Sequence, residues 1–142
     1  MRYGVLTFMD VMGEKYGVCR KTIMKQYQLS TIEVDVILFL ANHPGIDTAG
    51  DVVRLRKISK SHVSLAVKGL LARGYLSKEQ DQADHKLLHL KITPQAAEMV
   101  AFGQKQQQRF MQWIFGGFTE EEKQAALSAL DRIIDNTQKE EL

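Results

Sequence analysis

The first part of the chain carries apolar side chains at every third or fourth position, which is the spacing of one helix face. The members of this stripe within residues 5–27 are Val5, Phe8, Met12, Tyr16, Cys19, Ile23 and Tyr27. The pattern predicts a long amphipathic helix at the N-terminus, with one face that packs against other elements.

Two capping boxes predict the helices that follow. Ser30 and Glu33 stand three residues apart, as do Thr48 and Asp51, and such pairs satisfy the free backbone amides of a helix start. The helix that begins after Ser30 carries a run of apolar residues and ends at the His-Pro-Gly sequence of residues 43–45. The helix that begins after Thr48 is predicted to be short.

A further helix is predicted for the sequence ISKSHVSLAVKGLLARG, residues 58–74. Ser59 supplies a capping hydroxyl at its start, and Gly74 is a typical stop signal. On a helical wheel, the apolar stripe contains Val63, Ala66, Val67 and Leu70. The other face and its edges contain Ser61, His62, Ser64, Leu65, Lys68 and Ala72. The helix therefore buries one side and presents small polar groups, one leucine and a lysine on the other.

The period then changes from helical to alternating. Residues 76–80 and 88–92 change in character at every second position on either side of a polar turn, which predicts two antiparallel strands. Thr93 and Pro94 follow as a helix start, because threonine is a capping residue and proline is tolerated at the first helical position. We expect this helix to extend to Phe115.

A last helix is predicted after the glycine pair at residues 116 and 117. Thr119 and Glu122 form another capping box. The apolar stripe behind them contains Ala126, Leu127, Leu130, Ile133 and Ile134.

The order of three helices followed by a two-stranded hairpin is that of a winged helix-turn-helix. We therefore expect a mainly α fold with a small β-hairpin wing, flanked by N- and C-terminal helices. The expected division is an N-terminal helix at 1–28, a DNA-binding lobe at 29–93 and C-terminal helices at 94–142.

The distribution of charge is more informative than the net charge of +2. Residues 54–91 contain nine basic and three acidic side chains, whereas residues 118–142 contain three basic and seven acidic ones. The middle of the chain is therefore suited to an anionic partner. In the helix at 58–74, lysines can reach phosphates, while hydroxyls, His62 and Leu65 suit base edges and thymine methyl groups in a major groove.

Three segments of the chain resemble the MarR family of bacterial transcription regulators. They are LSTIEVDVILFL, then TAGDVVRLRKISKSHVSLAVKGLLARGYL, then DQADHKLLHLKIT followed by PQAAE. The likeness covers residues 29–98, and the flanking helices match in placement and length. It implies a homodimeric winged-helix repressor or activator, with outer helices at the dimer interface and DNA binding often controlled by a small ligand or an oxidant.

Carried onto this chain, the resemblance makes residues 59–68 the recognition helix and places Asp84 and Lys86 on the Asp and Arg of the family's wing. Two departures affect DNA contacts. Lys86 replaces an arginine and lacks its planar fork, and Leu65 stands where the family often has a basic residue. Base preference and affinity are expected to differ accordingly.

We expect a sequence-specific DNA-binding regulator, with repression as its outcome, that binds a palindromic operator as a homodimer and responds to a small-molecule effector whose site is unassigned. The residues expected to contact double-stranded DNA are Arg54, Lys57, Ser59, Lys60, Ser61, His62, Ser64, Leu65, Lys68, Lys78, Asp84, His85 and Lys86. The residues expected at the dimer interface are Val5, Phe8, Met12, Phe110, Trp113, Ile114, Leu127, Leu130 and Ile134.

Other functions remain open from the sequence: a winged-helix module for protein contacts, a small ligand-binding protein, and a redox- or metal-responsive regulator. Cys19 is the only cysteine and lies on the apolar stripe, so it is either a core residue or a thiol sensor. The four histidines, His43, His62, His85 and His89, lack the close pairs typical of a zinc site, so no metal is expected.

No catalytic constellation or glycine-rich phosphate loop is present, so neither an enzyme nor a cofactor is expected. The longest apolar run, VILFLA at residues 36–41, falls short of the ~20 residues of a membrane span. The single cysteine allows no intrachain disulfide. We therefore expect a cytoplasmic protein without a membrane segment.

Overall fold

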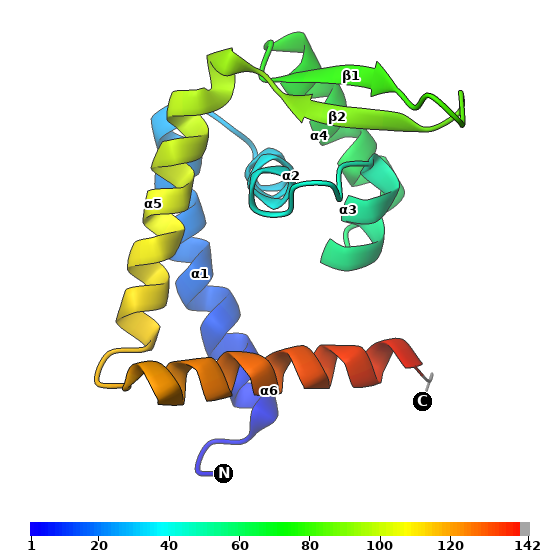
Figure 1. Ribbon diagram of the computed structural model, residues 1–142. Coiled ribbons are helices and arrows are strands. Elements are labelled where there is room, and N and C mark those ends of the chain that lie inside the picture. The colour runs from blue at the N-terminus through cyan, green and yellow to red at the C-terminus, as the bar shows by residue number, and fades with distance from the viewer. Residues whose placement is uncertain (140–142) are drawn as a thin grey trace. The chain divides into compact units, whose positions relative to one another are not determined.

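The fold is described by a computed structural model that covers residues 1–139 (Figure 1). The helices are α1 (Val5–Tyr27), α2 (Thr31–Asn42), α3 (Ala49–Arg56), α4 (Lys60–Ala72), α5 (Ala97–Ile114) and α6 (Glu120–Lys139). Strands β1 (Leu76–Gln80) and β2 (Leu88–Ile92) pair antiparallel, with Leu76 opposite Ile92 and Gln80 opposite Leu88. This order confirms the predicted mainly helical fold with a hairpin wing.

The chain forms two compact units, residues 1–108 and residues 109–142. The first contains the helix-turn-helix, the hairpin, α1 and most of α5; the second contains the end of α5 and α6. Within residues 1–139, no helix is both long and apolar enough to cross a membrane. The functional division at residues 28 and 93 stays a prediction.

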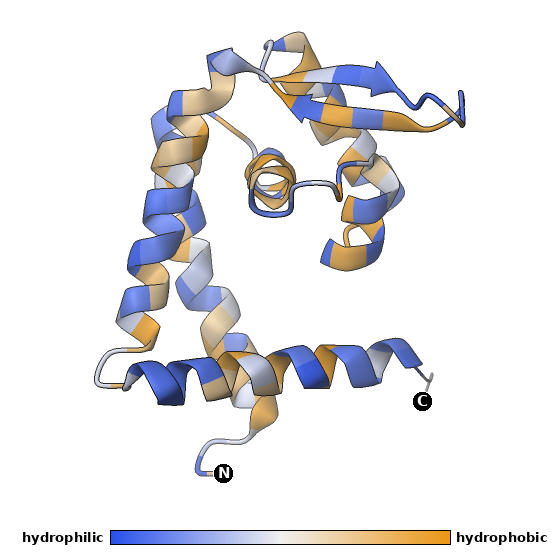
Figure 2. Cartoon of the chain, in the orientation of Figure 1, coloured by the Kyte–Doolittle hydropathy of each residue, from blue (hydrophilic) through white to orange (hydrophobic). Residues whose placement is uncertain are grey.

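Helix α2 is the centre of the first unit. Residues 34–40 are all buried, although neighbouring residues of a helix point in different directions. A helix surrounded on every side must be largely apolar all round, and Figure 2 shows most of α2 in the hydrophobic colour. Buried residues from each surrounding element complete the core: Ile23, Leu29, Val52, Val63, Leu70, Leu76, Leu90 and Met99.

The one charged residue in this buried run is Asp35, which is 5% exposed. Arg20 of α1 donates to both of its carboxylate oxygens, at 3.1 and 3.0 Å, and Arg56 at the end of α3 lies 3.6 Å away. A buried carboxylate requires such partners, because its transfer out of water is otherwise very unfavourable. The network joins α1, α2 and α3 at one point.

The predicted helix starts are confirmed for four helices. Ser30 with Glu33 and Thr48 with Asp51 form reciprocal capping boxes, and Ser59 accepts a hydrogen bond from the His62 amide. Thr119 and Glu122 cap α6 in the same reciprocal way. These signals depend only on residues three apart, so they are encoded locally.

Of the two helix signals that flank the hairpin, the stop at Gly74 is confirmed and the cap at Thr93 is not. Gly74 has a φ of 76°, which confirms the predicted end of α4, since glycine adopts this conformation most readily. The capping hydroxyl expected from Thr93 is wrong. Its Oγ1 donates to the Gly74 carbonyl at 2.5 Å, and Pro94–Ala96 forms a 3-10 turn before α5. A tertiary bond that closes the base of the wing therefore replaces the cap.

The contact between α5 and α2 depends on a missing side chain. Gly103 is buried, and a Cβ there would lie 2.7 and 3.0 Å from the two Cδ atoms of Leu38, itself buried. We expect Gly103→Ala to lower the free energy of unfolding by about 1–3 kcal/mol, because overpacking outweighs alanine's better helix propensity. Urea denaturation measures the change.

Gly50→Ala in α3 is the matched control, because the added Cβ would meet only Thr48 Oγ1, at an ordinary 3.8 Å. Its stability should stay equal to that of the wild type or rise. A Gly103→Ala protein as stable as the Gly50→Ala protein would contradict the close packing of α5 on α2.

Candidate nucleic-acid interface

Helices α3 and α4 form the helix-turn-helix. Helix α3 ends at Arg56, and Lys57 then takes a left-handed conformation with a φ of 55°. Ser59 begins the next helix by accepting from the His62 amide at 3.3 Å. The direction of α4 is thus set by a short turn and a side-chain cap.

Helix α4 has the two faces that its sequence predicts. Val63, Ala66 and Leu70 are buried and Val67 is half-buried. The exposed side chains of the helix include Ser61, His62, Ser64, Leu65, Lys68 and Ala72. Leu65 is 70% exposed, so its apolar surface is available to a partner. Small groups beside one leucine and a lysine suit entry into a major groove.

The wing turn is shaped by two aspartates. Asp81 Oδ2 accepts from the backbone amides of Ala83 and Asp84, at 3.0 and 2.9 Å. Asp84 Oδ1 accepts from the backbone amide of Lys86 at 3.0 Å. Such aspartate turns are local and self-supporting, so Asp84 shapes the loop that presents Lys86.

The basic residues of the central span divide into two groups. Four are engaged within the fold: Arg54 with Asp51, Arg56 with Asp35, Arg73 with the carbonyls of Tyr27 and Gln28, and Lys91 with Asp47. In the described part of the chain, the others form no ion pair: Lys57, Lys60, Lys68, Lys78 and Lys86. These five lysines therefore carry the positive charge of the span that no acidic side chain of the described residues neutralises. Arg54 remains partly exposed beside Asp51.

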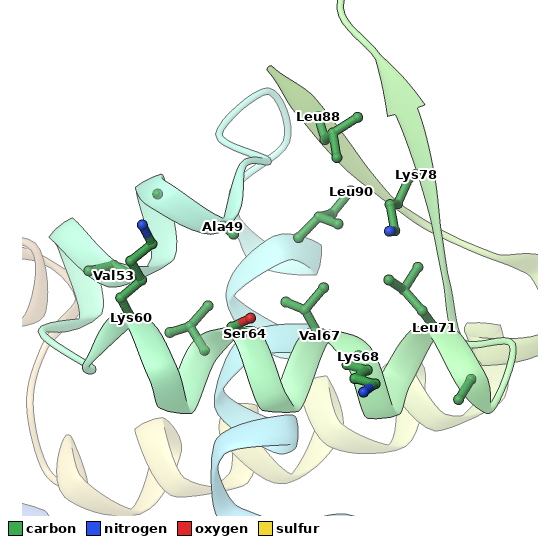
Figure 3. Close-up of a pocket in the computed structure, with 13 residues that line it drawn as sticks. Ala49, Val53, Lys60, Ser64, Val67, Lys68, Leu71, Lys78, Leu88 and Leu90 are labelled. Carbon is green, nitrogen blue, oxygen red and sulfur yellow. The ribbon is translucent and has the colours of Figure 1, made fainter. Parts of the chain in front are cut away.

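A groove of about 980 Å³ lies between α3, α4 and the hairpin. Figure 3 shows Val67 and Leu71 pointing from α4 toward Leu90 and Lys78 of the strands. The lining is largely apolar, and Lys60, Lys68 and Lys78 add three ammonium groups. The groove is continuous with the exposed face of α4, because Ser64 and Lys68 belong to both.

The sequence did not predict a cluster of His89, Lys91, Asp47 and Asp81 on the other side of the wing. His89 of β2 places Nδ1 2.5 Å from Asp47 Oδ1 and Nε2 2.7 Å from Asp81 Oδ1. Lys91 donates to Asp47 Oδ2 at 2.9 Å. The sequence had raised His89 only as a metal ligand; in residues 1–139 no group of three or more histidine, cysteine, aspartate or glutamate residues is placed to hold a metal ion.

The ionisation of this cluster is strongly coupled. Hydrogen bonds to Asp47 and Asp81 raise the pKa of His89. Burial alone would raise the pKa of Asp47, but the bonds from His89 and Lys91 hold it below its usual value. The bond from His89 and the turn amides lower the pKa of Asp81. The arrangement therefore favours an imidazolium between two carboxylates.

The residues expected at a dimer interface include many exposed apolar side chains. In the first unit, Val5 and Phe8 of α1 are exposed and Met12 is half-buried. In the second unit, Trp113 is 63% exposed, Leu130 and Ile134 are exposed, and Phe110, Ile114 and Leu127 are half-buried. Further exposed apolar residues of α1 are Leu6, Met9, Val11 and Val18. Such surfaces are typical of protein–protein contacts.

Cys19 is half-buried and packs against the core. Burial raises the pKa of its thiol, and nearby Arg20 opposes this only in part. A raised pKa disfavours the reactive thiolate. The core interpretation of this residue therefore has more support than the sensor interpretation.

Residues 27–87, which span α2 to the wing turn, match the model of the MarR family. This part of the chain is similar to MarR-family transcription regulators. The match covers the helix-turn-helix and most of the hairpin, the same region in which the resemblance lies.

Proteins with detectable similarity cover most of the length of this chain. The uncharacterised HTH-type transcriptional regulator YdgJ of Bacillus subtilis is 22% identical over 126 residues, which are 89% of this chain and 72% of YdgJ. A MarR-family regulator of Listeria monocytogenes, solved with 26-mer DNA, has a TM-score of 0.83 at 20% identity and covers 94% of this chain and 89% of its own.

Bordetella bronchiseptica BpsR, whose DNA binding is regulated by 6-hydroxynicotinic acid, has a TM-score of 0.70 at 21% identity. The alignment covers 94% of each chain. At these identities the structural likeness shows the fold alone. The DNA-contacting and dimer residues expected from the sequence therefore stay predictions.

Proposed function

We propose that this protein is a cytoplasmic, homodimeric repressor that binds a palindromic operator. The observation that carries the proposal is the exposed face of α4, where hydroxyls, His62, Leu65 and Lys68 project away from the core. In this arrangement α4 enters a major groove and the lysines of the turn and wing contact phosphates. The Listeria relative solved with DNA supports it.

The homodimer is supported by the apolar side chains exposed on α1 and, separately, on the second unit. A two-fold axis would repeat α4 on both sides of the dimer. Recognition helices of such dimers read half-sites about 34 Å apart. The operator would then be an imperfect palindrome with half-sites one helical turn apart.

Selection from a random double-stranded DNA pool at moderate salt tests the proposal. We expect enrichment of a palindrome whose half-sites lie one helical turn apart, because each protomer presents the same α4 face. Failure to enrich any sequence, with binding that disappears as salt rises, would contradict sequence-specific recognition. A protein partner of the wing would then be the better hypothesis.

Lysine and histidine variants separate phosphate contact from base readout. Lys68→Met should weaken binding to all sequences alike and reduce the slope of log affinity against log salt by about one, because one phosphate contact is lost. Lys105→Met in α5 is the matched control and should leave the slope unchanged. His62→Ala should instead relax the selected sequence, and an unchanged preference would remove His62 from the readout.

Effector control is supported by the groove beside α4. Its apolar floor and three lysines suit a small aromatic acid, the class to which the 6-hydroxynicotinic acid that regulates BpsR belongs. A ligand there would occupy Lys60, Ser64 and Lys68, which are also expected DNA contacts. Binding of ligand and operator would therefore be mutually exclusive.

A pair of probes tests this effector site. 6-Hydroxynicotinic acid should release the operator, whereas its amide, 6-hydroxynicotinamide, should act far more weakly, because the amide lacks the charge that the lysines attract. Release is followed by fluorescence anisotropy of labelled operator. Lys78→Met should weaken release by the acid about tenfold, with Lys105→Met as control. Equal release by acid and amide would contradict the lysine-lined site.

A further inference from the structure

His89 joins three separate parts of the DNA-binding lobe. It lies on β2, its Nδ1 meets Asp47 in the segment between α2 and α3, and its Nε2 meets Asp81 at the start of the wing turn. Asp47 directly precedes Thr48, the cap of α3. The imidazole therefore connects the wing turn to the start of the helix-turn-helix.

The backbone makes the same connection at a second point. The Asp47 carbonyl accepts from the Leu90 amide at 2.8 Å, and its carboxylate accepts from His89 and Lys91. Three consecutive residues of β2 are therefore held by one residue. At the far end, Asp81 orients the turn that presents Lys86, since it accepts two turn amides through Oδ2.

The two contacts of the ring require a particular protonation state. A neutral imidazole has one N–H donor, whereas the imidazolium has two. Both ring nitrogens face carboxylate oxygens. An ionised carboxylate can accept hydrogen bonds but cannot donate them. Loss of the proton therefore leaves one nitrogen lone pair directed at a carboxylate.

Each element next to the His89 ring contributes charged groups. Asp47 and Asp81 contact it, Lys91 shares its strand and binds Asp47, and Glu79 of β1 is paired directly opposite. Three carboxylates thus surround one ammonium and the imidazole. The balance of charge favours the protonated ring.

We propose that His89 is a positioning residue that holds the wing against the helix-turn-helix only when its ring is doubly protonated, so that operator affinity depends on pH. This rests on the proposed DNA-binding function. His89 itself need not contact DNA; it acts through the placement of Lys86 and the wing turn.

The direction of the pH effect follows from the shifts in the cluster. The pKa of His89 is raised, so its contribution is fully present below the ordinary histidine value of about 6.5 and is lost as pH rises through the raised pKa. The pKa values of Asp47 and Asp81 are lowered, so their contribution is lost only when pH falls through those lowered values. The wing is therefore held at pH values above the lowered pKa values of the two aspartates and below the raised pKa of His89.

Two variants with opposite expected behaviour test the proposal. His89→Gln removes the titration, and we expect its operator affinity at about pH 6 to be about tenfold lower than that of the wild type, at the level that the wild type reaches above the titration of His89. Asp81→Asn keeps one oxygen for the turn amides and offers an N–H to the neutral ring. Its affinity should persist as pH rises through the titration of His89, where that of the wild type declines.

A purely structural role for His89 would not produce this reversal. His43→Gln, at the C-terminal end of α2, is the matched control, because His43 is an exposed histidine of the same lobe that is not an expected DNA contact. It should keep the pH-dependent step that His89→Gln abolishes. If His89→Gln keeps the wild-type pH profile, or if Asp81→Asn declines with pH as the wild type does, the proposal is wrong.

A measurement without DNA separates this proposal from the proposed function. NMR titration of the His89 ring should give a pKa above its ordinary value, and amide protection of Asp81 and Leu87, both bonded within the wing turn, should decrease above it. This result without operator binding at any pH would retain the clamp and reject the DNA-binding function. An ordinary His89 pKa, or constant protection, would overturn the clamp itself.

Discussion

The burial of α2 is the constraint on which the lobe depends. Residues 34–40 lie inside the first unit on every side, so elements from both ends of the unit must close around this helix. One of those residues is Asp35, and a buried carboxylate needs ion-pair or hydrogen-bond partners inside the core. Arg20 and Arg56 meet this carboxylate from two different helices. The core therefore specifies which helices surround α2 and also how α1 and α3 are set against it.

That arrangement fixes the position of α4, the proposed recognition helix. Arg56 is the last residue of α3, and α4 begins at Lys60 after a single left-handed residue and the Ser59 cap. The Asp35 network thus lies a few residues from the proposed DNA-reading face. A buried ion pair is weak support for stability, but it can specify one arrangement of helices among several. Here its role is best described as alignment of α1, α2 and α3.

The sequence predicted what is encoded by short-range spacing. Helix starts at Ser30, Thr48, Ser59 and Thr119 follow from side chains and amides that are neighbours in the chain, and the buried stripe of α4 follows from its period. Thr93 was misread because its hydroxyl had a partner nineteen residues away, the Gly74 carbonyl. The same reason hid the role of Arg73, whose partners lie more than forty residues away in the chain, and that of His89, one of whose two partners, Asp47, is equally distant.

The division among the basic residues explains why charge counting alone describes the surface poorly. Arg56, Arg73 and Lys91 stabilise the lobe through internal partners, whereas the lysines of α4 and the wing are left for an external anion. The α4 lysines are on an element fixed by the core. Lys86 is on a turn joined to the rest through Asp47, Asp81 and one imidazole. The proposed DNA surface therefore has two parts. Helix α4 is fixed by the buried core, whereas the position of the wing turn depends, in our proposal, on the protonation of His89.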